Sequence, residues 1–219
     1  VCTLFVPLAV SVDTLKKEFP FSILCAVLLV IFGKIGMILG RADGIIFLVL
    51  FAAYLGWMIK SALSARNSAL SKEAEEADEQ IKILPVWQCI IYIIGGAVAI
   101  KFGGDFVVNG ASTIASSLGL SQNLIGLTIV ALGTSLPELV TSIVAAKKDE
   151  VDMALGNVIG SNIFNILLVL GVAGAISPVI FISENIIDII ILIIMSVVVW
   201  VFAWSKKKLV RWHGAVMLA

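Results

Sequence analysis

The sequence predicts an all-α integral membrane protein, a transmembrane helix bundle arranged as an inverted repeat. Three observations predict this fold: an apolar composition, apolar blocks long enough to cross a bilayer, and a repeated order of features at the two ends of the chain. Of the 219 residues, 60% are hydrophobic and 14% are charged, and the mean hydropathy is +1.12. A soluble domain averages about 25% charged residues, so the composition excludes a water-soluble core.

The apolar residues form blocks of the length that a membrane-spanning helix requires. A helix crosses the hydrocarbon core in about 20 mostly apolar residues. Six blocks meet this length, at residues 21–40, 44–62, 85–103, 123–145, 153–176 and 186–204, and partial blocks occupy 1–12 and 212–219. None of them shows the alternation of a β-barrel strand. They are therefore predicted to be helices, each antiparallel to the next.

The basic residues orient these helices. If the chain crosses the membrane at each block, four loops fall on one side, at 13–20, 60–84, 146–152 and 205–211. These loops hold all the Lys and Arg residues except Lys34, Arg41 and Lys101. Cytoplasmic loops carry an excess of Lys and Arg. We therefore expect a multi-pass protein of the cell membrane, inner or plasma, whose longest loop is a cytoplasmic linker.

An internal repeat relates the beginning of the chain to its end. Pro7 precedes a turn, an apolar block and the segment 40–44, and Pro178 precedes the same order of features, ending in the segment 210–214. The offset is 171 residues at the prolines and 170 at the Arg and Gly residues of the two segments. Five crossings separate the copies, so the second copy enters the membrane in the opposite orientation. Such inverted repeats are typical of secondary transporters, which bind their substrates near the midplane.

A carboxylate interrupts the fourth complete block. Glu138 lies near mid-membrane, where an ionisable side chain is a functional candidate by default. Thr134 and Ser135 precede it by four and three residues, so their hydroxyls are expected on the same helix face. Pro137 cannot donate a backbone hydrogen bond, which leaves the carbonyl of Gly133 available. Carboxylate, hydroxyl and carbonyl oxygens suit Ca²⁺, and the absence of His and Cys from the motif disfavours zinc and copper.

The next block carries a polar stripe. Asn157, Ser161 and Asn165 recur every four residues and therefore share one flank of a helix. Hydrogen bonds between helices would also explain these side chains. Beside a buried glutamate, however, the stripe is predicted to be the second wall of an ion site.

Two further charged residues are spaced so that they would lie on the same face of a helix. Lys101 precedes Asp105 by four residues near the end of a predicted span. They are interpreted as a local ion pair, or as side chains that extend to the membrane interface, rather than as part of a transport site.

The two polar motifs together resemble a known family. The segments 131–138 (ALGTSLPE) and 156–165 (GNVIGSNIFN) closely resemble the second α-repeat of sodium/calcium exchangers, of the calcium:cation antiporter superfamily. The resemblance extends over essentially the whole chain, which looks like the C-terminal part of a prokaryotic-type member. It implies ten helices in two inverted five-helix halves. Residues 1–62 would end the first repeat, 63–84 would be the linker, and 85–219 would form the second repeat.

The resemblance also implies which residues hold the ions. The family's ligands correspond here to Thr134, Ser135 and Glu138, to the backbone carbonyl of Ala131, and on the next helix to Ser161 and Asn165. Some members have an aspartate in place of Asn165. The neutral amide leaves the ion stoichiometry and any K⁺ dependence open.

The predicted function is exchange of Ca²⁺ for Na⁺ across the lipid bilayer by alternating access, with no catalysis and no cofactor. By the repeat offset, the counterpart of Glu138 would lie near position −33, so an N-terminal half of the same protein is expected to complete the site. A Ca²⁺/H⁺ or K⁺-dependent antiporter of the same superfamily is the alternative. A cation channel, which would pass current without a counter-ion, is the other rival. The net charge of zero indicates no nucleic-acid partner.

Overall fold

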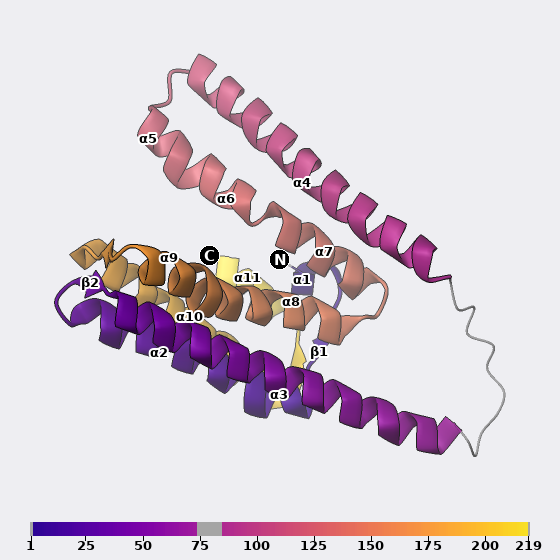
Figure 1. Ribbon diagram of the computed structural model, residues 1–219. Helices are drawn as coiled ribbons and strands as arrows, with labels where there is room; N and C mark the ends of the chain where they lie inside the picture. Colours follow the sequence, from indigo (N-terminus) through magenta and orange to yellow (C-terminus); the bar gives the residue numbers. More distant parts are fainter. Residues whose placement is uncertain (1, 74–84, 219) are drawn as a thin grey trace.

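The computed structural model describes residues 2–73 and 85–218, most of which are helical (Figure 1). In chain order the elements of the first part are α1 (Cys2–Phe5), β1 (Leu8–Ala9), the π-helical turn η1 (Thr14–Glu18), α2 (Phe19–Lys34), β2 (Ile38–Leu39) and α3 (Arg41–Glu73). Those of the second part are α4 (Val86–Ser117), α5 (Gln122–Ile125), the π-helical turn η2 (Gly126–Val130), α6 (Ala131–Thr134), α7 (Leu136–Lys147), α8 (Val151–Phe164), the π-helical turn η3 (Asn165–Leu170), α9 (Gly171–Ile176), β3 (Val179–Ile180), α10 (Ser183–Lys206), β4 (Lys208–Leu209) and α11 (Arg211–Leu218).

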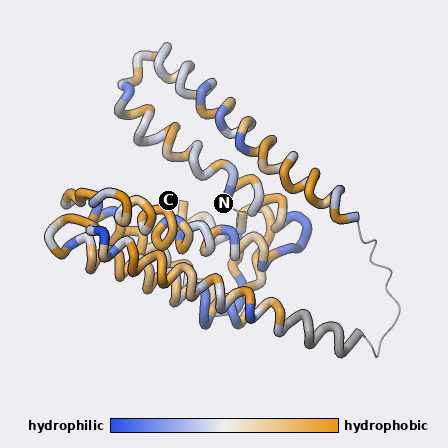
Figure 2. The backbone as a smooth tube through the Cα atoms, viewed as in Figure 1, coloured by the Kyte–Doolittle hydropathy of each residue, from blue (hydrophilic) through white to orange (hydrophobic). Residues whose placement is uncertain are grey.

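The helices are apolar along most of their length (Figure 2). Within the described residues, four helical segments are long and apolar enough to cross a membrane: Arg41–Ser64, Val86–Ser117, Val151–Ile176 and Ser183–Ser205. The bent pair Thr128–Thr134 and Leu136–Lys147 would make a fifth span. The chain is thus an all-α, multi-pass membrane protein, as its composition predicts.

Several helix ends differ from the predicted spans. The first complete span ends at Lys34 rather than at 40, because Gly36 (φ 75°) and Met37 (φ 54°) turn the chain into β2. The span predicted to end at 103 continues as helix to Ser117. The residues after 103 are more polar, which ends the apolar block but not the helix. α3 runs on through Glu73 into the predicted linker 63–84. The rest of that linker, 74–84, lies outside the described residues.

Two pairs of short strands show the internal repeat in three dimensions. β1 and β3 are related by the offset of 171 residues, and β2 and β4 by the offset of 170. Each strand pairs antiparallel with a strand of the other copy: Leu8 lies opposite Leu209 in β1–β4, and Ile38 opposite Ile180 in β2–β3. The exchange of partners between copies is what a pseudo-two-fold axis produces. η1 and α2 separate the two strand pairs, which lie at opposite ends of the bundle (Figure 1).

The same symmetry relates the contacts that begin α3 and α11. The amide of Gly40 donates a hydrogen bond to Asp43 Oδ2 (2.9 Å), and the amide of Val210 donates to His213 Nδ1 (3.1 Å). These are caps at the N-terminal ends of the two helices, 170 residues apart. The repeat is therefore inverted and extends to individual hydrogen bonds.

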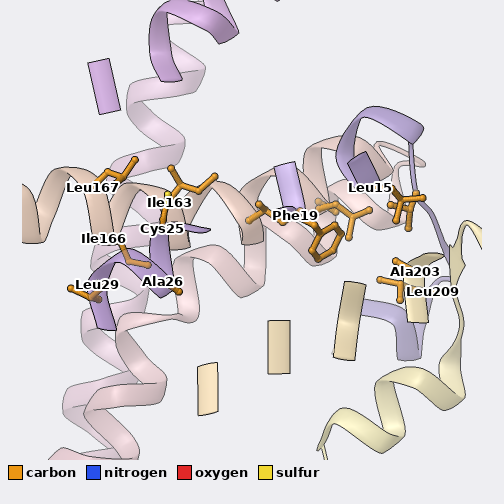
Figure 3. Packing of buried hydrophobic residues seen from close by; sticks show 14 of the residues in the cluster. Leu15, Phe19, Cys25, Ala26, Leu29, Ile163, Ile166, Leu167, Ala203 and Leu209 are labelled. Atoms are coloured by element: carbon orange, nitrogen blue, oxygen red, sulfur yellow. The ribbon is translucent and has the colours of Figure 1, made fainter. Parts of the chain in front are cut away.

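The buried core fixes one face of the helix that carries the polar stripe. In Figure 3, side chains of α2 lie against side chains of α8 and η3: Cys25, Ala26 and Leu29 on one side, and Ile163, Ile166 and Leu167 on the other. Ile159 and Ile163, both buried, lie two residues from Asn157 and Ser161. Two residues correspond to about 200° around a helix, so the polar stripe faces away from this core.

α4 lies to one side of the bundle. It packs on η2, α6 and α7, and its membrane-spanning window is not buried within this chain. In Figure 1 the hairpin of α4 and α5–α7 diverges from α2 and α3 and meets the bundle where α7 packs on α8. One wall of the site described below therefore comes from α4.

Candidate ion-binding site

A break in a transmembrane helix forms the centre of the candidate site. α6 and α7 meet at Ser135 with a bend of 49°. Ser135 has φ −94° and ψ 0°, outside the helical region, and Pro137 occupies the first turn of α7. Because proline has no amide hydrogen, it is tolerated in the first turn of a helix but not within one. The helix is thus broken just before Pro137. The carbonyl of Gly133, which the sequence predicts to be available, accepts a hydrogen bond from the Ser135 amide together with the carbonyl of Leu132.

Glu138 lies in the first turn of α7, next to this break. Its carboxylate oxygen Oε2 is buried, and no described residue donates a hydrogen bond to it. A buried carboxylate oxygen without a donor is costly, and unpaired polar groups of this kind in a native fold call for an explanation such as an ion. Glu138 is therefore a candidate for binding a cation.

Glu138 lines a cleft of about 680 Å³ between α4 and α7. The α4 wall is a single helical stripe that includes Gly96, Gly104 and, between them, Lys101. The opposite wall is formed by residues of α6, α7 and α8: Gly133, Thr134, Pro137, Glu138, Thr141 and Asn157. The glycines of the α4 wall, Gly96 and Gly104, have open space where a side chain would lie.

The structure brings only part of the predicted ligand set into this cleft. Thr134 and Glu138 line it, and the Thr134 hydroxyl donates to the carbonyl of Ala131 (2.8 Å). Ser135 lies at the helix break. The hydroxyl of Ser161 donates to the carbonyl of Val158 (3.0 Å).

Asn165, the last of the predicted ligands, begins the π-helical turn η3. Another π-helical turn, η2, ends immediately before Ala131. π-Helical turns are rare and occur frequently at functional sites. Each of the two candidate ligand segments thus adjoins a π-helical turn.

Asn157 makes hydrogen bonds between helices, the alternative that the sequence left open for the polar stripe. Its Nδ2 amide lies within hydrogen-bond distance of the Glu138 carbonyl (3.0 Å), the Thr141 hydroxyl (2.8 Å) and the Ser142 hydroxyl (2.9 Å). These contacts join α8 to the turn of α7 that bears Glu138. The four-residue stripe indicated that Asn157 faces a polar surface, but the sequence did not indicate that its partners are on α7.

We expect Asn157→Leu to loosen α7 from α8. The substitution keeps the approximate volume and removes the amide that links α8 to α7; the buried Ser142 hydroxyl loses its donor, and a buried group left unpaired costs about 1–3 kcal/mol. The expected result is a clear fall in the thermal unfolding midpoint in detergent. Asn162→Leu on the same helix is the control, since the side chain of Asn162 makes no hydrogen bond within the part of the chain that the structure describes. Equal midpoints for the two variants would contradict the role assigned to Asn157.

Comparison with known proteins places this architecture among ion exchangers. The family model described as sodium/calcium exchanger protein matches residues 89–219. The chain is 37% identical to the uncharacterized membrane protein MJ0091 of Methanocaldococcus jannaschii, over 96% of this chain and 66% of that protein. It is 41% identical to the sodium/calcium exchanger MaX1 of Methanosarcina acetivorans, over 53% of this chain and 33% of that protein.

A solved structure shares the fold over almost the whole chain. The sodium-calcium exchanger NCX_Mj, soaked with zero Na⁺ and Ca²⁺, matches with a TM-score of 0.75 and 30% identity, over 99% of this chain and 66% of that one. The relatives that match most of this chain are longer than it. The chain covers between about half and two thirds of their length.

Proposed function

Because this chain belongs to the sodium/calcium exchanger protein family, we propose that it forms the C-terminal part of an antiporter that exchanges Ca²⁺ for Na⁺ by alternating access. The observation that carries the proposal is Glu138, a carboxylate in a broken transmembrane helix, with a buried oxygen that no described residue hydrogen-bonds. The named exchangers among its relatives and its structural neighbour support this activity.

Six residues are proposed as ligands of the transported ions: Glu138, Thr134, Ser135, the carbonyl of Ala131, Ser161 and Asn165. Ca²⁺ takes six to eight oxygens, and Na⁺ accepts the same kind of oxygen. Occupation by one ion would exclude the other, because both need the charge of Glu138. The two ions compete for one set of oxygens, and the site opens to one side of the membrane at a time. Together these two conditions couple the Ca²⁺ flux to the Na⁺ flux.

A single carboxylate does not balance a dication. Among the side chains that the structure describes, no three from His, Cys, Asp or Glu gather to hold a metal ion. The inverted repeat predicts a second carboxylate, related to Glu138 by the pseudo-two-fold axis. We propose that an N-terminal half of the same protein supplies it and completes the site at the midplane.

The lysines in the loops indicate which end of the bundle faces the cytoplasm. The α7–α8 turn carries Lys147 and Lys148, and β4 begins at Lys208 near β1. We propose that this end of the bundle, together with the linker 63–84, is cytoplasmic in the plasma or inner membrane.

Flux measurements test the proposed exchange. The full-length protein that contains this chain is reconstituted into vesicles loaded with Na⁺ and diluted into Na⁺-free medium containing ⁴⁵Ca²⁺. Uptake should require the outward Na⁺ gradient and stop when an ionophore collapses it. Uptake driven instead by a pH gradient without Na⁺ would show a Ca²⁺/H⁺ antiporter, and uptake without any counter-ion would show a channel.

A further inference from the structure

A salt bridge lies at the middle of α4, in the same cleft as Glu138. Lys101 Nζ is 3.2 Å from Asp105 Oδ2, which confirms the predicted local ion pair. Lys101 is the sixteenth of the 32 residues of α4, and both side chains line the cleft. Charges at the middle of a transmembrane helix are expensive and mark ion pathways when they face a cavity.

The packing of α4 on α6 gives the position of this pair along the helix axis relative to Glu138. Val108 of α4 lies directly against Gly133, where a Cβ atom would overlap its side chain. α6 and α7 run antiparallel to α4 (Figure 1), so counting five residues from this contact in opposite directions, across the bend at Ser135, puts Glu138 near the level of Gly103, and Glu138 lines the same cleft as Gly104. Lys101 and Asp105 lie two residues to either side of that level, which is about 3 Å along the axis.

We propose that the charges of Lys101 and Asp105 bias the cation affinity of the site in opposite directions, each more strongly for Ca²⁺ than for Na⁺, so that the intact pair holds the two effects in balance. Asp105 attracts cations into the cleft, and the ammonium of Lys101 is a tethered cation that opposes them. Neither residue needs to touch the transported ion, because each acts through its field across the cleft. The inference rests on the proposed function, since it takes Glu138 as the ion ligand.

A fixed charge acts on the two ions unequally. A dication feels twice the energy of a monocation at the same place, so the change in Ca²⁺ affinity is the square of the change in Na⁺ affinity. For charges about 10 Å apart at an effective dielectric of about 50, removing one unit charge changes Na⁺ affinity about threefold and Ca²⁺ affinity about tenfold. A change in structure alone has no reason to follow this relation.

Equilibrium binding of ⁴⁵Ca²⁺ and ²²Na⁺ to the purified full-length protein tests the inference. Lys101→Gln should lower the Kd for Ca²⁺ about tenfold and the Kd for Na⁺ about threefold, and Asp105→Asn should raise both by similar factors. The double variant, which is neutral again, should return within about twofold of the wild type. Lys101→Arg keeps the charge and should bind like the wild type.

Lys34→Gln is the matched control for loss of a lysine charge. Lys34 ends α2, outside the cleft, and the same loss of charge there should leave both Kd values within about twofold. If Lys101→Gln does not fold, Asp105→Asn compared with Asp105→Glu decides the question. The inference is overturned if the single variants bind like the wild type, or if both ions shift by the same factor.

Binding separates this inference from the proposed exchange. A wild-type protein that binds Ca²⁺ but shows no Na⁺-driven flux would contradict the exchange and still allow the charge test. A wild-type protein that binds no Ca²⁺ would overturn both.

Discussion

Glu138→Gln in the full-length protein is expected to reduce Na⁺-driven ⁴⁵Ca²⁺ uptake to the level of empty vesicles. The amide keeps the shape of the side chain and removes the only full charge that the proposed ligand set contributes in this chain. Hydrogen bonds and ion contacts of a charged group are about twice as strong as those of a neutral one. We expect Ca²⁺ affinity to fall at least about 100-fold, which is about 2.7 kcal/mol.

Two further variants make this result specific. Glu138→Asp keeps the charge and should retain part of the uptake at a higher apparent KM. Glu184→Gln removes a carboxylate in the first turn of α10, outside the cleft, and should transport like the wild type. Undiminished uptake by Glu138→Gln, with the protein folded and correctly inserted, would remove Glu138 from the site.

Gly44→Ala is expected to destabilise the protein by about 3 kcal/mol, at the upper end of the cost of overpacking a core. A Cβ atom at position 44 would lie 2.7 Å from the carbonyl oxygen of Gly171 and 2.9 Å from the carbonyl carbon of Gly174, and closer still to the amide nitrogen of Ala175. These are backbone atoms of α9, which cannot move as a side chain can. α3 and α9 would have to separate, and we expect the thermal unfolding midpoint in detergent to fall sharply.

Gly56→Ala provides the control within the same helix. No atom lies within 4 Å of a Cβ built at Gly56, so alanine should stabilise α3 by about 0.5–1 kcal/mol through its higher helix propensity. Gly214 is the counterpart of Gly44 by the repeat, and its Cβ would overlap the side chain of Thr3. Gly44→Ala and Gly56→Ala variants of equal stability would contradict the close packing of α3 on α9.

The helical architecture and the repeat could be predicted from the sequence because both depend on local patterns. Apolar blocks of the required length identified the helices, and Pro7 with Pro178 gave the offset that the strands β1 and β3 follow. The pairing of each strand with the other copy could not be predicted, because two-residue strands such as Leu8–Ala9 have no pattern of their own.

The ends of the helices were harder to predict. The turn after Lys34 depends on the positive φ of Met37 as well as of Gly36, and methionine gives no signal for that conformation. α4 extends to Ser117 through residues whose lower hydropathy hides the continuation of the helix. Span prediction measures apolar length, whereas a helix continues wherever its backbone hydrogen bonds are made.

Within the candidate site, the local contacts could be predicted and the long-range ones could not. The i, i+4 spacing placed Thr134 with Glu138, and both line the cleft. The bonds from Asn157 to α7 and the position of Lys101 in the cleft depend on how separate helices pack, which spacing along one helix does not reveal. For that reason the sequence indicated only a local ion pair or an interfacial side chain at Lys101.

Binding of ⁴⁵Ca²⁺ to the purified full-length protein, measured against increasing Na⁺, tests the central claim most directly. The account predicts that Na⁺ displaces Ca²⁺ competitively from the wild-type protein and that Glu138→Gln removes the Na⁺-sensitive binding. Ca²⁺ binding that persists in Glu138→Gln and remains sensitive to Na⁺ would contradict it.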